Sequence, residues 1–123
     1  MLAIPAVLLL SGAVALGVVL GLEYLRRARS KPTIIGLHLL LGAGGLEVIA
    51  MLLRGTPDGA VMPAGGIGHA AGGLLALALC SGLLVPLVGR RSRATMNVAL
   101  VTHVSVSAAG FLLCLWWFVR AAW

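Results

Sequence analysis

Three histidines are the residues of this chain best suited to chemistry. His38, His69 and His103 each lie inside or at the edge of a long apolar stretch. Ionisable side chains are costly inside a lipid bilayer, and those found there usually serve a function. A neutral imidazole can bind a metal ion or haem iron through a ring nitrogen. The three histidines are therefore the first candidate site residues.

Small residues follow each histidine at positions four and seven, which share its face on a helix. They are Gly42 and Gly45 after His38, Ser107 and Gly110 after His103, and Gly73 and Ala76 after His69. A flat macrocycle held between helices needs an axial imidazole and a groove without bulky side chains beside it. The pattern therefore favours a cofactor, although small residues also mediate ordinary helix packing in membranes.

His38 and His103 are expected at nearly the same depth. His38 follows Ser30 by eight residues and His103 follows Arg93 by ten, which at about 1.5 Å per residue places them about 12 and 15 Å along their helices. Two imidazoles at one level suit the six-coordinate iron of a b-type haem. We predict His38 and His103 as its axial metal ligands; another pigment or metal, or plain helix packing, are the alternatives.

His69 and Glu47 form a second, weaker set of candidates. His69 lies near the opposite end of its apolar stretch and could ligate a second cofactor, contact a quinone head group or cap its helix. Glu47 follows His38 by nine residues, which at 3.6 residues per turn places it on the opposite side of the helix. It could carry a proton, bind a quinone or contact a partner helix; a protonated carboxyl bonded to a neighbour is the structural alternative.

The elements that position these residues follow from the composition. Of the 123 residues, 61% are hydrophobic and 10% charged, whereas soluble domains carry about 25% charged residues. Four apolar stretches are each long enough for a span of about 20 residues, at 2–25, 33–53, 67–88 and 94–119. Continuous apolar stretches of this length cross a bilayer as helices. The sequence predicts an all-α, up-and-down bundle of four transmembrane helices in one integral-membrane domain.

The basic residues indicate the orientation of that bundle. Seven of the nine form two clusters, Arg26, Arg27, Arg29 and Lys31, and Arg90, Arg91 and Arg93. The positive-inside rule predicts that both loops are cytoplasmic, so both termini lie on the outer side, and we expect a bacterial inner membrane. The clusters could also contact anionic lipid head groups. No basic face with interleaved aromatic residues supports binding to nucleic acid.

The sequence has no phosphate-binding glycine loop, no nucleophile elbow and no paired-cysteine metal motif. The loops between the apolar stretches are short and leave no room for a catalytic domain. Any reaction is therefore expected on a cofactor or in a partner, which favours a non-catalytic subunit of an oxidoreductase complex.

The two histidine motifs carry a family resemblance. His38 with Gly42 and Gly45, and His103 with Ser107 and Gly110, resemble the small four-helix membrane cytochromes b and the haem-carrying anchor subunits of respiratory complexes. The resemblance implies electron transfer between a peripheral redox subunit and the quinone pool, with other membrane subunits as partners. Di-haem members need four histidines, and three are present, so one haem b is expected.

Two other classes of function compete with this one. A cofactor-free structural or assembly subunit would pack its small-residue faces against partner helices. A small transporter would use Glu47 and His69 as a proton relay. Many transporters contain internal repeats, and none is visible in this sequence, which argues against the third class.

Overall fold

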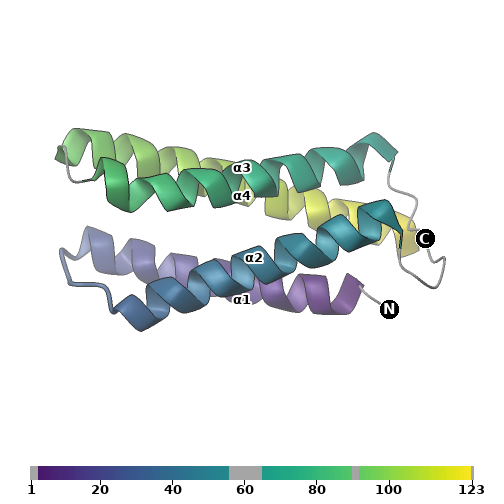
Figure 1. The fold of residues 1–123 in the computed structure, drawn as a ribbon, viewed down its shortest axis with the longest axis horizontal. Helices are drawn as coiled ribbons and strands as arrows, with labels where there is room; N and C mark the ends of the chain where they lie inside the picture. Colours follow the sequence, from purple (N-terminus) through teal and green to yellow (C-terminus); the bar gives the residue numbers. More distant parts are fainter. Residues whose placement is uncertain (1–2, 56–64, 90–91, 123) are drawn as a thin grey trace. The chain divides into compact units, whose positions relative to one another are not determined.

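The computed structural model describes residues 3–55, 65–89 and 92–122, and it contains four helices (Figure 1). They are α1 (Ala3–Leu25), α2 (Pro32–Arg54), α3 (Gly65–Val88) and α4 (Arg93–Ala122). All four are long and apolar enough to cross a membrane. The predicted all-α fold with four such helices is confirmed, and the helix ends lie within a few residues of those predicted. The Arg90–Arg91 part of the second basic cluster lies outside the described residues.

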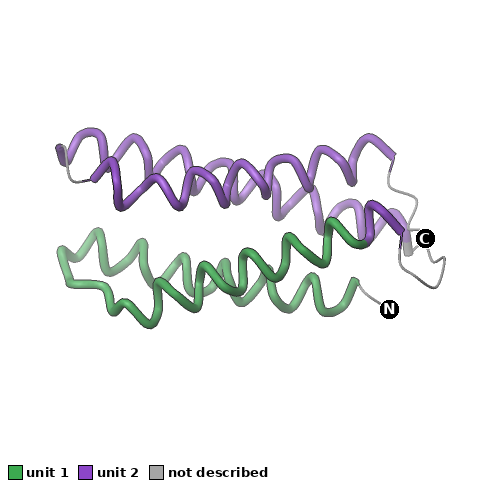
Figure 2. The backbone as a smooth tube through the Cα atoms, in the orientation of Figure 1, with its two compact units in different colours: residues 1–51 green, residues 52–123 purple. Residues whose placement is uncertain are grey.

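The chain divides into two compact units, residues 1–51 and 52–123 (Figure 2). The first holds α1 and most of α2, joined by a short turn. The second holds the last turn of α2 together with α3 and α4. Each unit is described below by itself as a helical hairpin.

Small side chains let α1 and α2 pack closely in the first hairpin. Ala6, Leu10 and Ala13 are the buried residues of α1, spaced along one face. Leu10 lies against Gly45 of α2, where an added Cβ would come within 2.6 Å of the Leu10 Cδ2 atom. Close backbone approach at glycine and alanine is the usual basis of helix association in lipid, where burial from water contributes nothing between spans.

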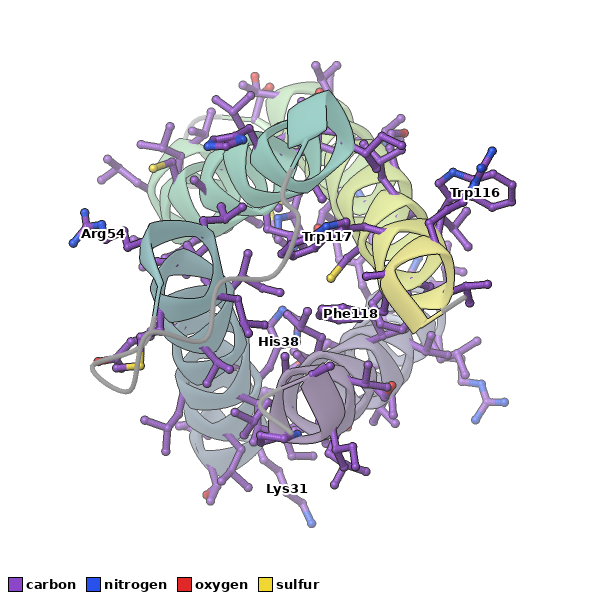
Figure 3. All side chains as sticks on the ribbon, turned by 90° about the vertical axis from the view of Figure 1, so that its right-hand side faces the viewer. Lys31, His38, Arg54, Trp116, Trp117 and Phe118 are labelled. Carbon is purple, nitrogen blue, oxygen red and sulfur yellow. The ribbon has the colours of Figure 1, made fainter. Side chains whose placement is uncertain are left out.

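The second hairpin has the same kind of interface, with aromatic residues at one end. The buried residues of α3 are mostly small: Gly68, Ala71, Gly72, Leu75, Ala78 and Val85. Trp117 of α4 lies over Gly68, and its ring stacks on that of Phe118 with 5.2 Å between centroids. Trp116 extends from another side of α4 (Figure 3), where the Arg120 guanidinium lies 5.2 Å from its ring centroid.

The turn after α1 has a strained residue. The Ala28 amide donates to the Glu23 carbonyl at 2.8 Å and the Arg27 amide to the Tyr24 carbonyl at 3.1 Å, the pattern of a Schellman cap. The cap places Arg27 at a φ of 55°. This left-handed conformation suits glycine and costs other residues about 1–2 kcal/mol.

Replacing Arg27 with glycine is expected to raise the free energy of unfolding by about 0.5–1 kcal/mol, because it removes the clash of Cβ with its own backbone. Reversible unfolding in SDS would measure the change. Arg29→Gly is the matched control, since it removes the same charge from a residue that has no positive φ. Equal effects of the two variants would contradict the prediction.

Candidate functional site

His38 projects from α2 against the backbone of α1 (Figure 3). Its Nδ1 atom lies 2.8 Å from the carbonyl oxygen of Ala13, in a partly buried position. Gly17 follows one turn later on α1, and a Cβ there would lie 3.1 Å from the His38 Cε1 atom. The missing side chain of Gly17 is therefore what lets the imidazole lie close to α1.

His103 has the same arrangement in the second hairpin. Its Nδ1 atom lies 2.9 Å from the carbonyl oxygen of Ala78 on α3. A Cβ on Gly82, one turn later, would lie 2.8 Å from the His103 Cε1 atom and 3.1 Å from Nδ1. The Ser81 hydroxyl donates to the Ala78 carbonyl at 3.0 Å, and its oxygen lies 3.3 Å from the His103 Nδ1. The His103 imidazole thus lies against the Ala78 carbonyl, the Ser81 hydroxyl and Gly82.

These contacts assign the tautomer of both imidazoles. A carbonyl oxygen only accepts hydrogen bonds, so Nδ1 carries the proton in each ring. A neutral imidazole protonated on Nδ1 has its lone pair on Nε2. Histidines that bind metals commonly have one ring N–H donated to a carbonyl, which orients the ring and makes the ligating nitrogen more basic. Both rings are therefore oriented by a backbone carbonyl, as metal-binding histidines commonly are.

The predicted groove residues have different surroundings. Gly42 has no atom within 4 Å of an added Cβ, whereas a Cβ on Gly45 would meet Leu10 and one on Gly110 would meet Leu74 and Leu75 at 3.1–3.2 Å. Gly45 and Gly110 therefore serve contact between the two helices of their hairpins. The Ser107 hydroxyl donates to the His103 backbone carbonyl at 2.6 Å. That these four residues line a cofactor stays a prediction.

The second set of candidates lies at exposed positions. His69 occupies the start of α3, where its Nδ1 lies 3.0 Å from the Gly65 carbonyl oxygen of the same helix. Glu47 is exposed on α2, with Met51 and Arg54 exposed one and two turns further on. In the described part of the chain, no three His, Cys, Asp or Glu side chains come together as metal ligands.

The backbone partners of the histidines are the functional groups that sequence reasoning missed. They are contributed by Ala13 with Gly17 and by Ala78 with Gly82. One signal could have found them, because both hairpins contain alanine, then glycine four residues later, then histidine twenty-one residues after the glycine.

Comparisons with known protein families, with curated proteins and with solved structures find no match. The functional assignment therefore depends on the site geometry.

Proposed function

We propose that the chain is an integral-membrane electron-transfer subunit in which His38 and His103 are the axial ligands of one b-type haem. The observation that carries this proposal is that both imidazoles are held alike, with Nδ1 on an alanine carbonyl at 2.8 and 2.9 Å. This contact fixes the ring through Nδ1, as is usual for histidines that bind metals.

Haem fits the available donors better than a bare metal ion does. A structural zinc ion takes about four protein ligands at one point, and the described residues offer no cluster of even three. Haem brings four equatorial nitrogens of its own and asks the protein only for axial ligands. Two histidines therefore provide the number of protein ligands that one haem asks for.

Bound haem would supply one-electron chemistry, and the residues of this chain would tune it. His38 and His103 would hold the haem, and their Nδ1 contacts with the Ala13 and Ala78 carbonyls would make each imidazole a stronger donor to it. Ser81 adds a hydroxyl beside one of the two rings. The chain itself binds and orients the cofactor, so the catalytic steps belong to partner subunits of a larger redox complex.

The proposed setting is the bacterial inner membrane. Arg26, Arg27, Arg29 and Arg93 are exposed residues at the ends of the two hairpin turns, which supports cytoplasmic turns that contact anionic lipids and outer termini. The quinone pool is the proposed exchange partner. Glu47 and His69, which are exposed, are the proposed proton or quinone contacts.

A structural subunit without cofactor is the second candidate function. The same Nδ1–carbonyl bonds join α1 to α2 and α3 to α4. Hydrogen bonds between membrane helices contribute about 0.6 kcal/mol on average. In this case the histidines join the two helices of each hairpin and bind no cofactor.

Asparagine variants separate the two functions. The asparagine amide can donate a hydrogen bond from about the position of the imidazole Nδ1, but it offers no lone pair at the position of Nε2. We expect the purified wild-type chain to show a Soret band and one haem per chain in the pyridine haemochrome assay. His38→Asn and His103→Asn should each remove the six-coordinate spectrum, while His69→Asn should leave it unchanged.

Circular dichroism and gel filtration in detergent would show that the variants are folded. Correctly inserted wild-type protein without haem would overturn the proposed function. An unchanged six-coordinate spectrum in either His38→Asn or His103→Asn would overturn the assignment of that ligand.

A further inference from the structure

The two hairpins contain the same histidine contact at a constant distance along the chain. His103 lies 65 residues after His38, and the same separation relates Ala78 to Ala13, whose carbonyls hold the two Nδ1 atoms at 2.9 and 2.8 Å. The glycines that face the two Cε1 atoms, Gly17 and Gly82, have this separation as well. Three interacting groups are therefore repeated together.

The packing between the helices of each hairpin repeats with the same separation. A Cβ on Gly45 would meet the Leu10 Cδ2 atom at 2.6 Å, and a Cβ on Gly110 would meet the Leu75 Cδ2 atom at 3.2 Å. Buried residues correspond too: Ala6 with Ala71, Leu10 with Leu75, Ala13 with Ala78, Gly45 with Gly110, and Ile49 with Cys114. A shared interface and a shared polar contact indicate one structural unit present twice.

We infer that the chain is a tandem repeat of one helical hairpin, in which residue i of the first corresponds to residue i+65 of the second, and that the duplicated feature is an imidazole ligand site. In this correspondence α1 matches α3 and α2 matches α4, each in the same order along the chain. The halves are thus direct repeats along the sequence.

The residues that differ between the halves indicate what the repeat is for. Glu47 corresponds to Leu112 and His69 to Ile4, so neither member of the alternative proton relay is duplicated. The histidine, the carbonyl that orients it and the glycine beside it are duplicated. The function common to both halves therefore involves the histidine that the neighbouring helix holds through a backbone carbonyl.

A ligand class follows, and this step depends on the proposed function. Two histidines that are held alike by neighbouring carbonyls match a ligand that takes two imidazoles of the same kind. The iron of a porphyrin has this form, with one axial position on each face of the macrocycle. Each half is inferred to contribute one of the two histidines of the proposed haem site.

Disulfide crosslinking of the full-length chain tests the repeat without any cofactor. In a Cys80→Ala/Cys114→Ala background, Leu10→Cys with Gly45→Cys and Leu75→Cys with Gly110→Cys should both oxidise to near completion. The added Cβ positions lie 2.8 and 3.2 Å from the Leu10 and Leu75 Cγ atoms, which is compatible with disulfide geometry. The pair Leu10→Cys with Gly42→Cys is the control and should not close, since nothing lies within 4 Å of a Cβ on Gly42. Mass spectrometry after alkylation would quantify the products.

Equivalence of the ligands is tested by haemin titration of the full chain. His38→Asn and His103→Asn should weaken binding by the same factor within about threefold, a difference of about 0.65 kcal/mol at RT ≈ 0.59 kcal/mol. Crosslinking of only one matched pair would overturn the repeat. Equal crosslinking with no haem bound would leave the repeat standing and overturn the proposed function. Loss of haem in one histidine variant alone would overturn the symmetric site.

Discussion

Replacing Gly45 with valine is expected to separate α1 from α2, whereas replacing Gly42 with valine is expected to leave the hairpin intact. A Cβ on Gly45 would lie 2.6 and 2.8 Å from the Leu10 Cδ2 and Cγ atoms and 3.5 Å from its backbone nitrogen. Leu10 is only 4% exposed, so its side chain has little room to move. Overpacking typically costs about 1–3 kcal/mol, and this site should reach about 3 kcal/mol because valine adds two further carbons.

Gly42→Val is a matched control for Gly45→Val. Both glycines lie on α2 and receive the same side chain, but a Cβ on Gly42 has no neighbour within 4 Å. Labels at Ala3 and Arg54, the first residue of α1 and the last of α2, would report hairpin opening by energy transfer during SDS titration. If the two valine variants open at the same SDS concentration, the contact between Gly45 and Leu10 does not stabilise the hairpin.

The helices could be predicted from the sequence because one physical rule dominates. A bilayer admits continuous apolar stretches almost only as helices, so hydropathy located α1 to α4 within a few residues. The main difference is the end of α4, predicted at Val119 and found at Ala122. Arg120 does not end the helix, because its guanidinium lies over the Trp116 ring and a cation at a helix C-terminus is favourable.

The histidines of the candidate site could also be predicted, whereas the only sequence signal for their partners is the repeated spacing of alanine, glycine and histidine. A backbone carbonyl such as that of Ala13 has no signature in residue type, and hydropathy does not tell which turn of a neighbouring helix faces an imidazole. The glycines that follow each histidine could indicate either a cofactor groove or helix packing, because hydropathy does not tell which residues face a neighbouring helix. Gly45 shares a face with His38, and because His38 faces α1, Gly45 also contacts α1 through Leu10.

The repeat that we infer escaped the sequence because lipid tolerates exchange among apolar side chains. Gly12 corresponds to Leu77 and Val7 to Gly72, so overall similarity between the halves is low. Positions in the contact between helices tolerate fewer substitutions than positions that face lipid, because a methyl group added at Gly45 or Gly82 has no space. The correspondence therefore survives mainly at the interface, and the contacts show which of the matching residues belong to it.

Replacing Gly82 with alanine is expected to weaken haem binding by about 10–100-fold, the usual effect of disturbing the residues that orient a metal ligand. The new methyl would lie 2.8 Å from the His103 Cε1 atom and 3.1 Å from Nδ1. The ring must then turn away from the Ala78 carbonyl, which loosens the bond that orients Nε2. Gly17→Ala should have a smaller effect, because there the corresponding distances to His38 are 3.1 and 3.5 Å.

Haemin titration of apo-protein would measure both affinities, with Gly73→Ala as the control. Gly73 lies on α3 like Gly82, but nothing lies within 4 Å of an added Cβ there, so its affinity should match the wild type. The Soret maximum should also change in Gly82→Ala as the iron loses one strong axial ligand. If all three variants bind haemin with wild-type affinity, the glycine does not position the ligand and the role assigned to the His103 contact is wrong. The loss of haem affinity should be largest for Gly82→Ala, smaller for Gly17→Ala and absent for Gly73→Ala. That order would show that haem affinity depends on the space beside each imidazole.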